Sequence, residues 1–377
     1  MHPDILYMNR HRRTTPTYHN NNSNTTSITS SSIIHNIHNN TVPQQMPFLY
    51  QASLSKHTIT MYNNAYMKLI RYIQHYNISI THNTDWDQVI QQYIHHIYIH
   101  NTQRNKSGKA EAQLAYSAFI HYHPQLSRRL VISLKSLRGF DKIKPSISHI
   151  AMQWELLLVM SMTATHHNRH DIGIALLLQF DCYLRISELC NININNIILP
   201  SSTLHIQSEH NKQFTHFRTG RILTIIIPTS KTGVNQQVSI NNPHIEHILI
   251  QWINKRKQSN CTTLFSFTDT QYRNILKQLQ SYTGTAHIPY TPHSIRHGGV
   301  THDLYRYGLS ALSEIKYRGR WQQDDSMKIY TQGLASSIKQ PPLPQHIINM
   351  YQSYQHIYVH LLLISIRYRS CVNLRFT

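Results

Sequence analysis

Residues 291–332 read TPHSIRHGGVTHDLYRYGLSALSEIKYRGRWQQDDSMKIYTQ, and this stretch decides the fold of the second half of the chain. Pro292 suits the first turn of a helix, where a missing backbone N–H costs nothing. Gly308 is a residue type that ends helices. We therefore expect one helix over residues 292–307 and a second over residues 309–317, which Gly319 ends.

Four side chains in this stretch suit chemistry on a phosphate group. His293 and Arg296 are three residues apart, so they share one face of the expected helix. Arginine is a planar, permanently charged fork that matches phosphate oxygens, and the indole N–H of Trp321 is a hydrogen-bond donor. Tyr330 follows nine residues after Trp321, in an expected short helix. A phenol oxygen among such donors can attack phosphorus.

A second arginine lies upstream, in YLRISEL at residues 183–189. Apolar residues lead into Arg185, and a lone guanidinium at the end of a buried helix is costly unless it is paired. Glu188 lies one helical turn further on and is its natural partner. A purely structural Arg–Glu pair would explain both residues without any role in catalysis.

Lys231 lies in PTSKTG, at an expected turn between two strands. Thr232 and Gly233 are residue types of turns that expose a side chain. An exposed lysine in a turn is usually only a solvated charge. A catalytic role for Lys231 therefore depends on where it lies in the sequence relative to the other motifs.

The ordered set YLRISEL, PTSKTG, His-x-x-Arg-His, Gly-Arg-Trp and Ile-Tyr-Thr resembles the tyrosine recombinase (phage integrase) family over residues 147–332. Each motif alone is weak, but all of them in this order are specific. Trp321 stands where many members of the family have His, and both offer an N–H. The resemblance implies that Glu188 and His297 support a set of catalytic residues: Arg185, Lys231, His293, Arg296, Trp321 and Tyr330. Lys231 is 46 residues after Arg185, more than expected for the family, so Lys212 is the alternative catalytic lysine.

The resemblance also implies a reaction. Tyr330 would attack a phosphorus of double-stranded DNA, form a 3′-phosphotyrosyl bond and release a 5′-hydroxyl, which a second strand would replace. Cationic side chains take the place that metal ions hold in other phosphoryl-transfer sites, so we expect no cofactor and no metal. The family implies a homo-oligomer, a tetramer on two DNA sites.

The fold class expected is mainly α with a small antiparallel β-sheet (α+β). Apolar residues recur at helical spacing, run together as in buried helices, or alternate as in strands, in eleven segments. The helices are expected at 59–73, 86–97, 110–120, 125–137, 147–162, 171–184, 243–256 and 270–282, and the strands at 204–207, 221–228 and 236–240. Thr84-x-x-Asp87 is similar to a capping box at the start of the second helix.

Five parts of the chain are expected. Residues 1–45, rich in Asn, Ser, Thr and His, predict a disordered tail. Residues 46–138 predict a helical DNA-binding (core-binding) domain. Residues 139–146, GFDKIKPS, predict a linker, residues 147–340 the catalytic tyrosine-recombinase domain, and residues 341–377 a C-terminal tail that includes a helix.

The chain of 377 residues has 36 Lys and Arg against 16 Asp and Glu, a formal net charge of +20. This excess indicates a polyanionic partner, nucleic acid before membrane. The candidates for DNA phosphate contacts are Lys106, Lys109, Arg128, Arg129, Lys135, Arg138, Lys142 and Lys144. The alternative is a solvated helix surface for the first six, and a plain tether for the two lysines of the linker. The four cysteines show no disulfide or zinc spacing, which favours an intracellular location, the nucleus if the source is eukaryotic. The longest apolar run is too short to span a bilayer.

Three other functions were weighed. A type IB topoisomerase would use a related tyrosine and would relax DNA without exchanging partners. A domesticated element would bind DNA without catalysis, although all six catalytic positions hold competent residues. A His-rich metal protein is the third class, since His166 with His167 and His293 with His297 are spaced loosely enough for a site. With 29 His in the chain, however, such spacings arise often by coincidence. The biased composition resembles that of a eukaryotic mobile element, similar to the recombinases of DIRS-like retrotransposons or Cryptons.

Overall fold

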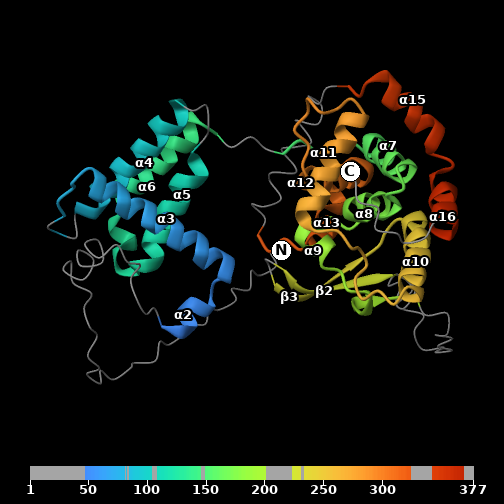
Figure 1. Ribbon diagram of the computed structural model, residues 1–377, viewed down its shortest axis with the longest axis horizontal. Helices are drawn as coiled ribbons and strands as arrows, with labels where there is room; N and C mark the ends of the chain where they lie inside the picture. The colour runs from blue at the N-terminus through green and yellow to red at the C-terminus, as the bar shows by residue number, and fades with distance from the viewer. Residues whose placement is uncertain are drawn as a thin grey trace, which may run out of the picture. The chain divides into compact units, whose positions relative to one another are not determined.

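The computed structural model describes residues 47–80, 82, 85–103, 108–145, 149–200, 223–230, 233–323 and 342–368. The chain divides into two compact units, Met1–Ser146 and Ile147–Thr377 (Figure 1). We call them the N-terminal unit and the C-terminal unit.

The described part of the N-terminal unit is a small helical bundle. Helix α3 packs against α5, and α4 packs against both α5 and α6. Tyr66, Trp86 and Phe119 are fully buried between them, and the rings of Trp86 and Phe119 lie 4.8 Å apart. The elements are α2 (Phe48–Ala52), α3 (Lys56–His75), α4 (Asp85–Gln103), α5 (Lys109–Tyr122), the 3₁₀ helix η1 (Pro124–Arg129) and α6 (Val131–Ile143).

The start of α6 differs from the expectation. The single helix predicted over residues 125–137 is two elements, η1 and α6. The carboxylate of Asp87 accepts the backbone N–H groups of Ile132 and Ser133, each at 2.8 Å. Thr84, its partner in the predicted capping box, lies outside the described residues. Asp87 therefore satisfies N–H groups at the start of α6, which otherwise lack partners within that helix.

The predicted linker is also shorter than expected, because α6 continues to Ile143. Glycine inside a helix costs about 1 kcal/mol relative to alanine. The helix nevertheless runs through Gly139, since the next residue, Phe140, is 3% exposed and packs into the core. Burial of that ring outweighs the helix propensity of its neighbour.

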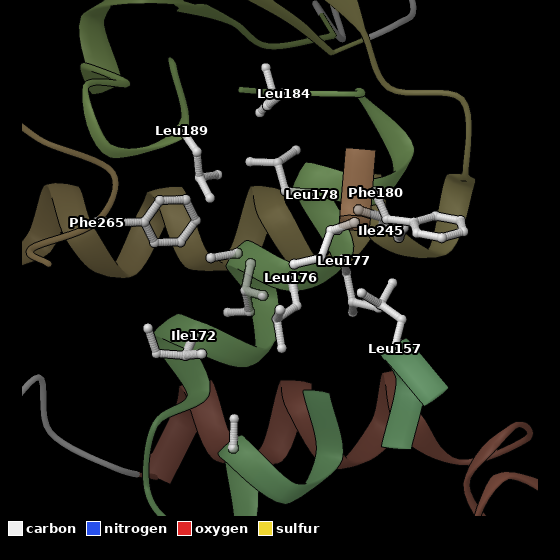
Figure 2. Packing of buried hydrophobic residues seen from close by; sticks show 14 of the residues in the cluster. Leu157, Ile172, Leu176, Leu177, Leu178, Phe180, Leu184, Leu189, Ile245 and Phe265 are labelled. Atoms are coloured by element: carbon white, nitrogen blue, oxygen red, sulfur yellow. The ribbon is translucent and has the colours of Figure 1, made fainter. Parts of the chain in front are cut away.

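The C-terminal unit is built around α7 (Trp154–His166) and α8 (His170–Asp181). Both helices are buried on nearly all sides, the pattern of a helix at the centre of a domain. Figure 2 shows their side chains, such as Leu157 and Leu177, interleaved with those of neighbouring elements. The surrounding helices are α9 (Ile186–Cys190), η2 (Ile194–Asn196), α10 (Pro243–Gln258), α11 (Asp269–Tyr282), α12 (Pro292–Tyr307), η4 (Leu309–Ala311), α13 (Leu312–Gly319), α15 (Gln345–Tyr354) and α16 (Tyr358–Tyr368).

A three-stranded antiparallel sheet lies at one side of this core, in the order β1 (Ile197–Ile198), β2 (Thr224–Ser230), β3 (Gly233–Ser239). Ile225 pairs with Ile197 on one side and Val238 on the other. The first strand is therefore Ile197–Ile198, whereas the predicted strand at 204–207 lies outside the described residues. A mainly α fold with a small antiparallel sheet is confirmed.

The C-terminal segment was predicted as a tail beyond the catalytic domain, and this prediction is wrong for residues 345–368. Helix α15 packs on α7, and α16 packs on α10, α7 and α8 (Figure 1). Ile347 and Leu362 are completely buried in the main core. Tyr358, Leu362 and Ile366 recur every four residues, so α16 buries a single apolar face. In the described part of the chain, no helix combines the length and the hydropathy that crossing a membrane requires.

Candidate active site

Helix α12 carries His293 and Arg296, and two glycines fix where it lies. A Cβ atom added at Gly298 would lie 2.1 Å from the carbonyl oxygen of Met152, and one added at Gly299 would lie 2.1 Å from that of Phe180. Backbone therefore meets backbone at this point, which only glycine permits. The close approach brings α12 against the end of α8, directly before the turn that carries Arg185.

That turn has a left-handed residue at its centre. After α8, Tyr183 has φ +47° and is fully buried. Arg185 then stands immediately before α9, where its own N–H is unpaired within the helix. Glu188 Oε2 accepts this N–H at 2.8 Å, and Glu188 Oε1 accepts a second hydrogen bond from Arg185 Nη1 at 2.6 Å. The pair expected from the spacing is present, with the Arg185 side chain 21% exposed.

Glu188 also binds a cation that the sequence did not single out. Arg320 Nη2 donates to Glu188 Oε2 at 2.7 Å, and both side chains are almost completely buried. Burial alone would raise the pKa of Glu188. The charges of Arg320 and Arg185, with their hydrogen bonds, outweigh that effect and lower it below its ordinary value. Glu188 is therefore ionised at neutral pH and holds two guanidinium groups.

Arg296 is enclosed by protein and is 1% exposed. Its Nη1 donates to the carbonyl oxygen of Tyr183, and its Nη2 donates to that of Gly319 at 2.7 Å. The guanidinium lies 4.6 Å from the centre of the Trp321 ring, a cation–π contact. A Cβ atom at Gly319 would overlap that ring, so the glycine makes room for the indole.

These contacts join the two catalytic arginines predicted from the sequence. The carbonyl oxygen of Tyr183 accepts from Arg296 and also, at 3.4 Å, from Arg320. Arg320 in turn shares Glu188 with Arg185. We call this set, Arg185, Glu188, Arg320, Arg296 and the Tyr183 carbonyl, the arginine network.

His293 is exposed beside the network, and two other imidazoles lie against it. The ring centres of His149 and His297 are 4.8 and 4.6 Å from that of His293. Desolvation, together with the charges of His149, Arg296 and Arg185, lowers the pKa of His293 to about 4. Desolvation and the neighbouring imidazoles lower the pKa of the buried His297 to about 3. Both rings are therefore neutral at pH 7.

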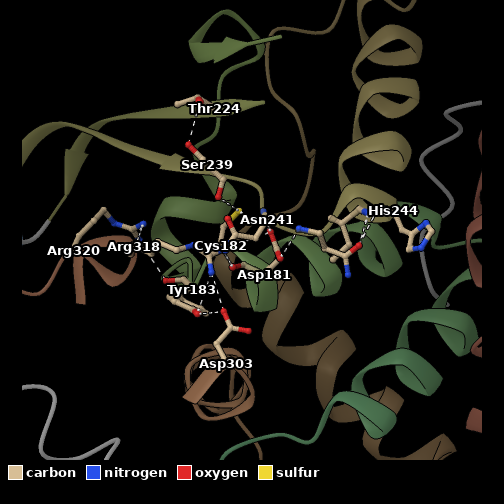
Figure 3. Close-up of polar contacts among 12 residues, drawn as sticks. Asp181, Cys182, Tyr183, Thr224, Ser239, Asn241, His244, Asp303, Arg318 and Arg320 are labelled. Carbon is tan, nitrogen blue, oxygen red and sulfur yellow. Dashed lines mark hydrogen bonds and ion pairs between the residues drawn. The ribbon is translucent and has the colours of Figure 1, made fainter. Parts of the chain in front are cut away.

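A second polar network lies under the turn (Figure 3). The Tyr183 hydroxyl donates to Asp303. Arg318 Nη1 donates to Asp303 Oδ2 at 2.9 Å and to the Tyr183 hydroxyl at 3.2 Å, while its Nη2 donates to the carbonyl oxygen of Asp181 at 2.6 Å. These bonds tie α8, α12 and α13 together around Tyr183. They were not predicted, because no spacing in the sequence indicates that Arg318 and Asp303 are neighbours.

The structure thus brings Arg185, Glu188, His293, Arg296 and Trp321 into one region, with His297 behind them. Lys231, its alternative Lys212, and Tyr330 lie outside the described residues, and the catalytic roles remain predictions. His149 and Arg320 were missed. His149 had only the signal of a histidine among 29, whereas Arg320 directly precedes the predicted Trp321.

The candidates for DNA contact in the N-terminal unit fall into two groups. Lys135, Arg138 and Lys142 are exposed on α6 at positions that share one side of the helix, and Arg128 and Arg129 are exposed on η1. The other candidates have protein partners or are not described: Lys109 forms an ion pair with Asp141, Lys144 lies 5.4 Å from the Tyr98 ring centre, and Lys106 lies outside the described residues. Within the described ranges, no group of His, Cys, Asp and Glu could hold a metal ion.

Comparison with known proteins gives a family and a fold. Residues 153–336 match the model of the phage integrase family. The XerH site-specific recombinase bound to difH substrate before cleavage is 13% identical, with a TM-score of 0.53 over 85% of this chain and 91% of that one. A lambda integrase dimer bound to a COC′ core site is 12% identical, with a TM-score of 0.50 over 74% of this chain and 89% of that one. At these identities the likeness shows the fold. No curated protein sequence matches the chain.

Proposed function

Because residues 153–336 place this chain in the phage integrase family of tyrosine recombinases, we propose that it breaks and rejoins DNA through a 3′-phosphotyrosyl bond to Tyr330. The observation that carries the proposal is the arginine network. It holds Arg185 and Arg296 in one connected set of hydrogen bonds, with the exposed, neutral His293 beside them.

Fixed cations of this kind suit phosphoryl transfer. The phosphorus gains negative charge as Tyr330 attacks, and cations that the bound complex already holds beside it stabilise that charge. Arg185 and Arg296 bind the non-bridging oxygens. His293, as a neutral imidazole, donates a hydrogen bond or takes the tyrosine proton. Lys231, or Lys212 in its place, protonates the 5′-oxygen that leaves.

The burial of Arg296 adds a requirement. Its guanidinium lies against the Trp321 ring and is 1% exposed, so a phosphate oxygen reaches it only after the surrounding groups shift. We expect DNA binding to move the Trp321 indole off the guanidinium and to turn its N–H toward the phosphate. DNA binding should quench tryptophan fluorescence in the wild type, and Trp321→Phe should remove this quenching. Quenching of the same size in Trp321→Phe would contradict this step.

Covalent trapping tests the nucleophile. We expect a nicked suicide duplex to give a protein–DNA adduct on a denaturing gel, and Tyr330→Phe to abolish the adduct while DNA binding persists. Tyr317→Phe and Tyr307→Phe are matched controls, because both side chains are exposed on neighbouring helices. Loss of the adduct in either control, but not in Tyr330→Phe, would move the nucleophile elsewhere.

Strand exchange separates a recombinase from the alternatives. Two differently labelled duplexes should yield joined products that carry both labels. Relaxation of supercoiled DNA without joined products would instead indicate a type IB topoisomerase. Salt-dependent binding with no cleavage of any substrate would indicate a domesticated DNA-binding protein.

We also propose the assembly and the setting. The partner is double-stranded DNA, in keeping with the net charge of +20, and the active form is a tetramer on two DNA sites. The biased composition supports a mobile element similar to DIRS-like retrotransposons or Cryptons, acting in a eukaryotic nucleus. The mass of the complex with two DNA sites, measured by analytical ultracentrifugation, tests the tetramer, since a complex with two protein chains would exclude it.

A further inference from the structure

Gln179 lies in the last turns of α8 and is completely buried. Its side-chain nitrogen Nε2 donates two hydrogen bonds, to the carbonyl oxygens of Leu184 and Pro292, each at 3.1 Å. Its oxygen Oε1 accepts the hydroxyl of Tyr272 at 2.7 Å. Both N–H donors and the carbonyl of the amide are therefore used.

Each of the two carbonyls belongs to the residue just before a predicted catalytic residue. Leu184 directly precedes Arg185, and Pro292 directly precedes His293, although the two carbonyls are 108 residues apart in the chain. The Leu184 backbone is held a second time, because its N–H donates to the carbonyl oxygen of Gln179 at 3.1 Å. One amide group thus bridges the segment that carries Arg185 and the segment that carries His293.

We propose that Gln179 is a positioning residue, which sets the separation of Arg185 and His293 in the reactive complex. This inference rests on the proposed function. The amide nitrogen acts through the backbone, because its two hydrogen bonds go to the carbonyl oxygens of the residues that precede Arg185 and His293. Catalysis is sensitive to such settings, since a shift of about 1 Å in a catalytic group costs on the order of a hundredfold in rate.

A residue that only stabilises the fold would behave differently. Its loss would lower the melting temperature and the fraction of folded protein, but each folded, DNA-bound molecule would cleave at the normal rate. A positioning residue lowers kcat at saturating DNA while KM and the DNA dissociation constant stay near their original values. The rate of covalent adduct formation per bound molecule therefore separates the two roles.

The first variant is Gln179→Leu, which keeps roughly the volume of the side chain and removes both N–H donors. Its matched control is Trp252→Phe, which removes the hydrogen bond from a buried indole to the carbonyl oxygen of Leu264 in the same unit. Gln179→Leu removes the donor to two buried carbonyls and the acceptor of the Tyr272 hydroxyl, and Trp252→Phe removes the donor to one carbonyl, so both variants lose stability. We expect adduct formation in Gln179→Leu to slow by about tenfold to a hundredfold, and in Trp252→Phe to stay at the wild-type rate.

The second variant is Gln179→Glu, which has nearly the same shape. As a neutral acid it donates one hydrogen bond to the carbonyls, and as an anion it donates none and repels both. Its cleavage rate relative to wild type should therefore fall as pH rises through the pKa of the new carboxyl group. Measurement well below the melting temperature, on folded and bound protein, excludes unfolding as the cause.

The outcomes are distinct. The inference is supported if the wild type forms the adduct, Gln179→Leu forms it more slowly, and the rate of Gln179→Glu relative to wild type falls as pH rises. Equal rates for Gln179→Leu and wild type overturn it and leave the proposed function intact. If Gln179→Leu does not fold, the test rests on Gln179→Glu. A cleavage rate of Gln179→Glu relative to wild type that does not change with pH then overturns the inference. Absence of any wild-type adduct refutes the proposed function, and the inference falls with it.

Discussion

The arginine network of the C-terminal unit and the basic side chains of α6 in the N-terminal unit are held in opposite ways. In the C-terminal unit, Arg296 and Arg320 are 1% and 7% exposed and donate to carbonyl or carboxylate oxygens of the protein. In the N-terminal unit, Lys135, Arg138 and Lys142 are exposed along one side of α6. A buried cation is costly unless its partners are in place, whereas an exposed one costs little and gives little stability.

Under the proposed function, the difference suits two kinds of contact with DNA. A cation fixed by buried partners can stabilise charge that develops in a transition state. An exposed cation on a flexible side chain neutralises a phosphate and adds affinity, with little effect on geometry. Substitutions in the arginine network should therefore change stability and reaction rate, and substitutions along α6 should change affinity and its salt dependence.

The largest effect is expected for Glu188→Ala, which leaves Arg320 buried without its carboxylate. Loss of one partner of a buried ion pair costs about 3 to 5 kcal/mol of unfolding free energy, measurable by denaturant titration. Glu314→Ala is the matched control, because Glu314 is exposed in the first turn of α13. A loss in Glu188→Ala no greater than that in Glu314→Ala would contradict the described network.

The Glu188 carboxylate should also make the free energy of unfolding fall at acid pH. The pKa of Glu188 is lowered below 4.5 in the folded chain, so its contribution is present above pH 4.5 and is lost as pH falls further. The pKa of His297 is lowered from 6.5 to about 3, so the unfolded chain takes up that proton first and stability falls from pH 6.5 downward. Glu188→Gln should flatten the curve below pH 4.5, and His297→Gln should remove part of the fall between pH 6.5 and about 3.

Arg296→Lys should affect the reaction next most strongly. A lysine is a point charge that cannot reach the Tyr183 and Gly319 carbonyls in the same forked geometry. Removing a fixed donor from such a site costs roughly a hundredfold to a thousandfold in rate, measured as single-turnover cleavage at saturating DNA. Arg306→Lys, exposed on the same helix, should cleave normally. Equal rates for the two variants would remove Arg296 from the catalytic set.

Two glycine substitutions should have effects of opposite sign in the two units. Gly298→Ala places a methyl group 2.1 Å from the Met152 carbonyl oxygen, and relieving such overpacking costs about 1 to 3 kcal/mol. Gly139→Ala meets no atom within 4 Å inside α6, and should stabilise the N-terminal unit by about 0.5 to 1 kcal/mol. Thermal unfolding reports both, and a destabilised Gly139→Ala would show that α6 is not helical there.

The smallest effects are expected on α6. Arg138→Ala should weaken binding to all DNA sequences, and should reduce the slope of log affinity against log salt by about 0.9 if one phosphate contact is lost. The cleavage rate at saturating DNA should not change. Lys277→Ala, exposed on α11, is the control. An unchanged salt slope in Arg138→Ala would assign this side of α6 to solvent.

Local signals predicted much of the framework. Pro292 and Gly308 mark the two ends of α12. The spacing of Arg185 and Glu188 alone makes their ion pair plausible. The failures are long-range. Asp87 satisfies backbone groups 45 and 46 residues away, and Arg320 reaches Glu188 across 132 residues, which no local pattern encodes. The burial of α15 and α16 likewise depends on apolar faces of α7 and α10 that only the folded chain brings near.

The most direct test of the central claim is to identify the residue that carries DNA in the trapped complex. The complex would be formed with a nicked duplex in the presence of EDTA, digested, and the DNA-linked peptide sequenced by mass spectrometry. We predict a 3′-phosphotyrosyl link at Tyr330 and undiminished yield without metal. A link to any other residue, or a yield that requires a divalent cation, would contradict the account.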